Sequence, residues 1–253
     1  MIIASLVLLP SLVAAAPAKK KSTPRPLVAK DTETYSLPLY PPTTAPITVP
    51  LVIERFTEFD GKLKSMTCEF SQAVRWEQSG VAQNVEGSLE YRKPELIHIE
   101  QKQPEPQTMV SDGAWLWIWR KSTNQVIQTK LEDWKRSEPL AQGLLDFGNY
   151  ADMLRKYDVS ISTIGAPDAG GYRELELALR PKERSKSGEF VLRLRLTTKD
   201  FFPDETNLEA GQVVVRSSFK NIRYNPPIKD ERFQFTPPAG ADVFENFKPP
   251  KPE

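Results

Sequence analysis

The chain has 253 residues, of which 39% are hydrophobic, so it is long enough to bury a substantial core in one large domain or two small ones. Its 34 basic and 33 acidic residues leave a net charge of +1, which argues against a nucleic-acid-binding protein, because such proteins usually carry a basic excess. The single cysteine, Cys68, excludes an intramolecular disulfide, and we interpret it as a small buried hydrophobe.

An apolar run opens the chain at residues 2–15 and ends in small residues. This pattern is typical of a signal peptide over residues 1–18, with cleavage after Ala15 or Ala18, and it predicts an exported protein. The run is shorter than the ~20 apolar residues that a membrane-spanning helix needs. A retained N-terminal anchor stays the alternative, because the basic residues Lys19–Lys21 follow the run instead of preceding it.

The next segment, residues 19–50, holds seven prolines and shows no apolar period. We therefore expect an extended, mostly disordered linker. A folded domain is predicted over residues 51–247, followed by a flexible tail at residues 248–253.

The domain is predicted to begin with an amphipathic helix of about four turns after Pro50. Its buried face would carry residues at helical spacing, namely Val52, Phe56, Phe59 and Leu63. From Thr67 onward the hydrophobic period changes to two, which predicts β-strands. About eleven strands are expected, at residues 67–76, 85–92, 96–102, 107–111, 115–119, 125–131, 158–164, 172–179, 190–196, 212–224 and 233–235. Because no crossover helices separate them, the sheet should be antiparallel.

Helical spacing returns only once within this β sequence, between residues 137 and 157. Two short helices are predicted there, the first carrying Leu144 and Leu145 and the second carrying Met153 and Leu154.

One predicted strand, at residues 115–119, holds three of the five tryptophans. Trp115, Trp117 and Trp119 share one face, and the other face is also apolar. Both faces of such a strand must be covered. The tryptophans could simply belong to the core, or they could line an apolar cavity.

The sequence offers little support for catalysis. Its only histidine, His98, has no nucleophile motif nearby and too few partners for a histidine-based metal site, so we interpret it as a half-exposed strand residue. Glu174 and Glu176 could form an acid–base pair, but their alternation with leucines indicates a solvated face. We expect neither an enzyme nor a bound cofactor.

Three segments resemble the outer-membrane lipoprotein carrier proteins of the LolA family. They are VSDGAWLWIWRKSTNQVIQTKL at residues 110–131, GSLEYRKPELIHIE at residues 87–100 and FQFTPPAGADV at residues 233–243. The resemblance implies a mainly β fold, an incomplete antiparallel β-barrel of about eleven strands with a helical lid over a hydrophobic cavity. It also implies a periplasmic, monomeric carrier that takes acylated lipoproteins from an inner-membrane lipoprotein-releasing ABC transporter and passes them to an outer-membrane receptor lipoprotein.

Alternation within the strands suggests which residues line that cavity. The predicted lipid-binding residues are Phe70, Val74, Leu89, Tyr91, Ile97, Ile99, Trp117, Leu175, Leu177, Leu192 and Leu194. Leu144, Leu145, Met153 and Leu154 would lie on the lid. In the family an arginine bonds to the lid from the position just before the proline in the turn that follows the second strand. Here that proline is Pro94, and Lys93 occupies the arginine's place, after Arg92. Either Arg92 substitutes for it or the lid closes more weakly, because lysine lacks the bidentate fork.

Three rival hypotheses remain from the sequence. The domain could sense lipids or lipoproteins without shuttling them, it could be an enzyme, or it could carry a different lipid. Fold alone does not decide among these.

Overall fold

The computed structural model describes residues 40–137, 149–182 and 190–245. Its helices are α2 Val49–Lys62, α3 Leu131–Ser137, α5 Tyr150–Lys156 and the 3-10 helix η1 Asp230–Phe233. Its strands are β1 Ser65–Trp76, β2 Ala82–Arg92, β3 Leu96–Gln103, β4 Gln107–Asp112, β5 Trp115–Arg120, β6 Gln125–Lys130, β7 Tyr157–Ile164, β8 Glu174–Pro181, β9 Phe190–Thr197, β10 Pro203–Ala210, β11 Val213–Tyr224 and β12 Asp242–Glu245. The predicted signal peptide, most of the linker and the C-terminal tail lie outside the described residues.

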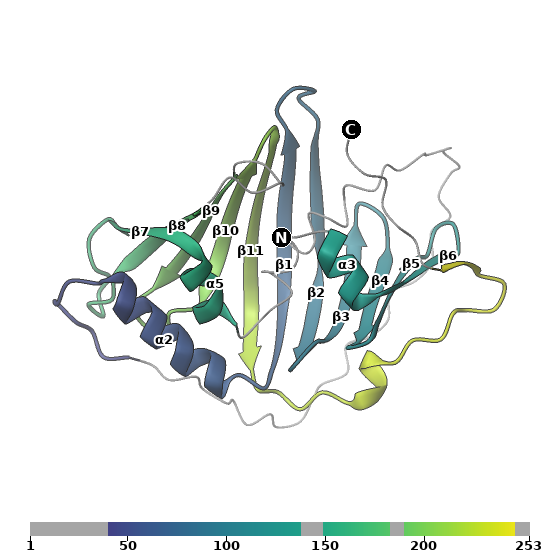
Figure 1. The fold of residues 1–253 in the computed structure, drawn as a ribbon, viewed down its shortest axis with the longest axis horizontal. Helices are drawn as coiled ribbons and strands as arrows, with labels where there is room; N and C mark the ends of the chain where they lie inside the picture. Colours follow the sequence, from purple (N-terminus) through teal and green to yellow (C-terminus); the bar gives the residue numbers. More distant parts are fainter. Residues whose placement is uncertain (1–39, 138–148, 183–189, 246–253) are drawn as a thin grey trace.

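All twelve described strands form one sheet in the order β12-β6-β5-β4-β3-β2-β1-β11-β10-β9-β8-β7. Strands β1 to β11 pair antiparallel with their neighbours, and β12 pairs parallel with β6. The sheet is curved and open, with β7 at one edge and β12 at the other (Figure 1). The predicted fold class, a mainly β incomplete barrel with an N-terminal helix and mid-chain helices, is confirmed.

The structure corrects several local predictions, and strand β12 is one that the sequence did not predict. Strand β10 went unpredicted, because its sequence PDETNLEA begins with proline and has few apolar residues. Residues 233–235 do not form a strand, since Phe233 ends η1. Helix α3 begins at Leu131, where the sequence predicts the end of a strand.

Helix α2 forms where the sequence predicts it. The Thr48 hydroxyl accepts a hydrogen bond from the Leu51 amide at 3.4 Å, and Pro50 lies in the first turn, where its missing amide proton costs nothing. Buried Val52, Phe56 and Phe59 form its apolar face.

The folded domain begins earlier than the sequence predicts. The Tyr40 amide donates to the Lys199 carbonyl at 2.8 Å, and the Tyr40 ring meets the Phe201 ring edge-on at 5.4 Å. The Tyr40 hydroxyl donates to Glu58 of α2 at 2.5 Å. Residues 40–48 therefore tie α2 to the turn between β9 and β10.

Helices α2, α3 and α5 lie on the same face of the sheet, which we call the inner face (Figure 1). An aromatic group joins the helices to the strands, with the Phe59 ring 5.5 Å from Phe202 and 5.8 Å from Tyr224. Leu131 and Trp134 of α3 belong to the same buried cluster. Among the described residues, no helix is long and apolar enough to cross a membrane.

Candidate functional site

Ten of the eleven predicted cavity residues lie on the inner face. Strand register establishes this, because Tyr91 pairs with Ile97, and Leu177 pairs with Leu194. None of the ten is more than 4% exposed; they are Phe70, Val74, Leu89, Tyr91, Ile97, Ile99, Leu175, Leu177, Leu192 and Leu194. One apolar surface therefore runs across the sheet from β3 to β8. The part of these residues in lipid binding stays a prediction.

The prediction that Trp117 faces inward is wrong. Leu116 and Ile118 occupy the inner face of β5, and Trp117 lies on the opposite, outer face. Its ring centroid is 6.1 Å from that of Phe235, in the segment that follows η1. Successive residues of a strand point to opposite faces, and both faces of β5 are apolar. The sequence pattern alone therefore could not decide which face points inward, because that depends on the segment that packs on each face.

Residues 226–235, which we call the C-terminal segment, lie against the outer face of β2 to β5, before the chain joins the sheet as β12. Phe233 is only 2% exposed, and its ring lies 4.9 Å below the Arg92 guanidinium. Arg92 also pairs with Asp230 at 2.6 Å. Among the described residues, Arg92 therefore contacts the C-terminal segment rather than α2 or α5, and its substitution for the family arginine stays a prediction.

Lys93 contacts the N-terminal helix α2. Its Nζ donates a hydrogen bond to the main-chain carbonyl of Asp60, in the last turn of α2. The Asp60 carboxylate in turn accepts from the Ala151 amide of α5 at 2.9 Å. Lys93 and Asp60 thus join the β2–β3 turn to both helices, and we call this pair the latch. Burial raises the pKa of Asp60, although hydrogen bonds from α5 and the charge of Lys93 oppose that rise.

Helix α5 is the described part of the predicted lid. Its Met153 and Leu154 are buried, and the Tyr150 ring packs 5.5 Å from Phe56 of α2. Leu144 and Leu145 lie outside the described residues. Helices α2 and α5 therefore form one unit, which we call the inner cover.

His98 is buried rather than half-exposed, and it lies on the outer face. Its Nδ1 is 2.6 Å from the Arg232 carbonyl oxygen, and its Nε2 is 3.0 Å from Glu100. Burial alone would raise the pKa of Glu100, but hydrogen bonds from His98, Lys121 and Thr108 outweigh burial and hold it at about 2. This cluster fastens the C-terminal segment to the sheet.

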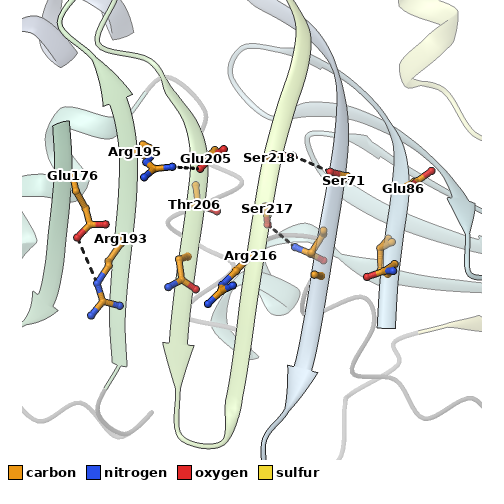
Figure 2. A pocket seen from close by; sticks show the side chains of 15 residues that line it. Ser71, Glu86, Glu176, Arg193, Arg195, Glu205, Thr206, Arg216, Ser217 and Ser218 are labelled. Carbon is orange, nitrogen blue, oxygen red and sulfur yellow. Dashed lines mark hydrogen bonds and ion pairs between the residues drawn. The ribbon is translucent and has the colours of Figure 1, made fainter. Parts of the chain in front are cut away.

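A polar groove of about 680 Å³ lies on the outer face, over β8 to β2 (Figure 2). Arg195 bridges Glu174 at 2.8 Å and Glu205 at 3.1 Å, and Arg193 contacts Glu209 at 2.6 Å. Both arginines are therefore paired with carboxylates. The charged lining of the groove distinguishes it from the apolar inner face.

The described residues hold no cluster of three or more histidine, cysteine or acidic side chains that could bind a metal. Burial raises the pKa of Cys68 to about 12, so its thiol stays protonated and unreactive at neutral pH.

Comparison with known proteins places residues 61–236 within the family model described as outer membrane lipoprotein carrier protein LolA. An outer-membrane lipoprotein carrier protein of Pseudomonas fluorescens is 26% identical over 195 residues, covering 76% of this chain and 88% of the relative. One from Alkalilimnicola ehrlichii is 29% identical over 183 residues, covering 72% and 78%. A crystal structure of a LolA superfamily protein from Nitrosomonas europaea aligns over 75% of this chain and 99% of its own, at 13% identity and a TM-score of 0.44.

Proposed function

The chain belongs to the LolA family of outer-membrane lipoprotein carrier proteins, and from this premise we propose that it is a periplasmic carrier of acylated lipoproteins. It receives its cargo from an inner-membrane lipoprotein-releasing ABC transporter and delivers it to a receptor lipoprotein in the outer membrane. The apolar run at residues 2–15 directs its export. The family is one of carriers rather than enzymes.

The observation that carries this proposal is the continuous apolar inner face. Ten side chains predicted to bind lipid line it from β3 to β8, and they belong to the same buried cluster as residues of α2, α3 and α5. Moving α2 and α5 together, as one unit, would expose this face to acyl chains. The latch is the polar contact that such a movement must break.

The free energy of exposing acyl chains to water explains why lipoproteins need a carrier. Each methylene removed from water contributes ~0.8 kcal/mol, so three chains of ~15 methylenes represent on the order of 35 kcal/mol. A lipoprotein cannot cross the periplasm against that cost without a surrogate apolar phase. Release at the outer membrane requires that the closed, empty state also be stable, which the buried contacts of the inner cover provide.

Native mass spectrometry with lipid extraction tests the proposal on protein purified from an envelope fraction. We expect co-purifying diacyl or triacyl species. Val74→Glu, on the inner face of β1, should abolish their binding, whereas Ala73→Glu, one residue away on the outer face, should leave it unchanged. Circular dichroism reports whether each variant is folded.

A second step separates a carrier from a lipid sensor. The loaded protein is mixed with acceptor vesicles bearing the outer-membrane receptor, and transferred lipoprotein is counted. Lipid binding without transfer to the vesicles would support the alternative hypothesis, a lipid-sensing domain of the same fold. Wild-type protein that carries no lipid and takes up no fluorescent acyl probe would contradict the proposal.

A further inference from the structure

Three polar side chains interrupt the apolar inner face in a single row. Thr206 of β10 is the cross-strand partner of Ser217 of β11, which is in turn the partner of Gln72 of β1. Their exposed fractions are 8%, 4% and 2%, so each is at least nine-tenths buried. We call these residues the polar row. Directly paired side chains lie about 5 Å apart, so the row is contiguous.

Apolar residues flank the polar row on both sides. Two positions along the strands, Val74, Val215 and Leu208 form the neighbouring row. On the other side, Phe70 pairs with Phe219. The polar row therefore lies within the surface that we propose for acyl chains.

The hydrogen bonds within the polar row are incomplete. Gln72 Nε2 donates to Ser217 Oγ at 2.9 Å, but Gln72 Oε1 and Thr206 Oγ1 are buried without any partner among the described residues. Ser217 accepts a bond, yet its own hydroxyl proton has no acceptor in that part of the chain. Turning the Gln72 amide would only leave its nitrogen unpaired instead.

A polar group buried without a hydrogen-bond partner lowers the stability of the folded protein. The unpaired groups of the polar row therefore indicate that a ligand supplies the missing hydrogen bonds. We propose that the polar row is a subsite for the ester or amide linkage that joins an acyl chain to its lipoprotein. The hydroxyls of Ser217 and Thr206 donate to the linkage carbonyl, and the Gln72 amide accepts from an amide N–H. This inference rests on the proposed function and adds to it a preference for acyl over alkyl chains.

The chemistry of the row selects this class of ligand. A hydrocarbon chain offers no acceptor, so it would leave both hydroxyls unpaired. A charged group would be desolvated without a counterion, because none of the three side chains is ionisable. A neutral carbonyl attached to an apolar chain satisfies both the row and its flanks.

Binding of two matched probes tests the subsite. The probes are one short cysteine peptide carrying either two ester-linked acyl chains or two ether-linked alkyl chains of equal length, each with the same fluorophore. Wild type should bind the ester probe about five- to tenfold more tightly, the ratio expected for one or two buried hydrogen bonds. Thr206→Val, which preserves shape and removes the hydroxyl, should reduce this ratio to about one or two.

Matched variants keep the test decisive. Thr206→Ser retains a hydroxyl and should keep the ester preference, and Ser218→Ala, on the outer face of β11, should leave it unchanged. Ser217→Ala gives a second reading if Thr206→Val does not fold.

Two outcomes would overturn the subsite. Equal affinity of wild type for both probes, or an unchanged ratio in Thr206→Val, would make the polar row a structural feature that internal water completes. Failure of wild type to bind either probe would instead overturn the proposed function, together with the inference that rests on it.

Discussion

Two covers pack against opposite faces of this sheet, and they are fastened differently. The inner cover, α2 and α5, packs through aromatic rings and is joined to the β2–β3 turn by the latch. The C-terminal segment lies on the outer face and is anchored by buried Phe233 and by ion pairs from Arg92 and Arg232. The apolar pattern of a strand face therefore does not by itself indicate which segment covers it or how that segment is fastened.

The largest effect should come from removing the anchor of the outer cover. Phe233→Ala deletes a ring that is 2% exposed, so the free energy of unfolding should fall by about 3–5 kcal/mol, measured by urea denaturation. Phe244→Ala, where the ring is 48% exposed, should change it by less than about 0.5 kcal/mol. Uptake of an acyl probe at the inner face should be unaffected by Phe244→Ala, and by Phe233→Ala under conditions where that variant remains folded. Faster uptake in folded Phe233→Ala would show that the covers are coupled.

Acid should affect the two covers in opposite directions. The pKa of Glu100, under the outer cover, is lowered from 4.5 to about 2, so its stabilising contribution is present above about pH 4.5 and is lost as the pH falls toward 2. Glu100→Gln should lower the free energy of unfolding at neutral pH by about 1–3 kcal/mol and remove this loss in acid.

The contribution of Asp60, in the inner cover, to stability changes with pH in the opposite direction. Its pKa is raised, so its contribution is fully present below about pH 3.8 and is lost as the pH rises through the folded-state value. Asp60→Asn keeps an acceptor for the Ala151 amide and should abolish that dependence. Urea denaturation of Glu100→Gln, Asp60→Asn and wild type between pH 2 and 7 measures these effects. If either variant showed the same dependence of unfolding free energy on pH as wild type, the role assigned to that carboxyl group would be contradicted.

Of the contacts that fasten the two covers, the hydrogen bond from Lys93 should contribute least to stability. Lys93→Met removes the donor to the Asp60 carbonyl, so unfolding should become easier by only about 0.5–1 kcal/mol. Uptake of a fluorescent acyl probe should nevertheless accelerate, because the inner cover opens more often. Lys93→Arg keeps a donor and serves as the control. An unchanged uptake rate in Lys93→Met would mean that the latch does not limit opening.

Much of the candidate site was predictable because it depends on the alternation of inward-facing and outward-facing side chains along each strand. Leu192 and Leu194, or Ile97 and Ile99, are separated by one residue that must face the other way, so their shared face follows from the strand itself. Strand β10 escaped prediction because its pairing with β9 and β11, rather than its own composition, holds it in the sheet.

The polar row also escaped prediction. Gln72, Ser217 and Thr206 are polar residues on three separate strands, and each alone resembles an ordinary surface position. Their burial and adjacency follow from the pairing of β1 with β11 and of β11 with β10. A sequence carries no local signal for such a pairing.

By itself the sequence determined the mainly β fold, the first helix and the apolar face of most strands, because these properties depend on residues close together in the chain. Only the tertiary structure decided that Trp117 faces outward, that Lys93 rather than Arg92 meets the inner cover, and that polar side chains meet within an apolar face. Each of these depends on segments far apart in sequence, whose contacts arise only when the sheet assembles.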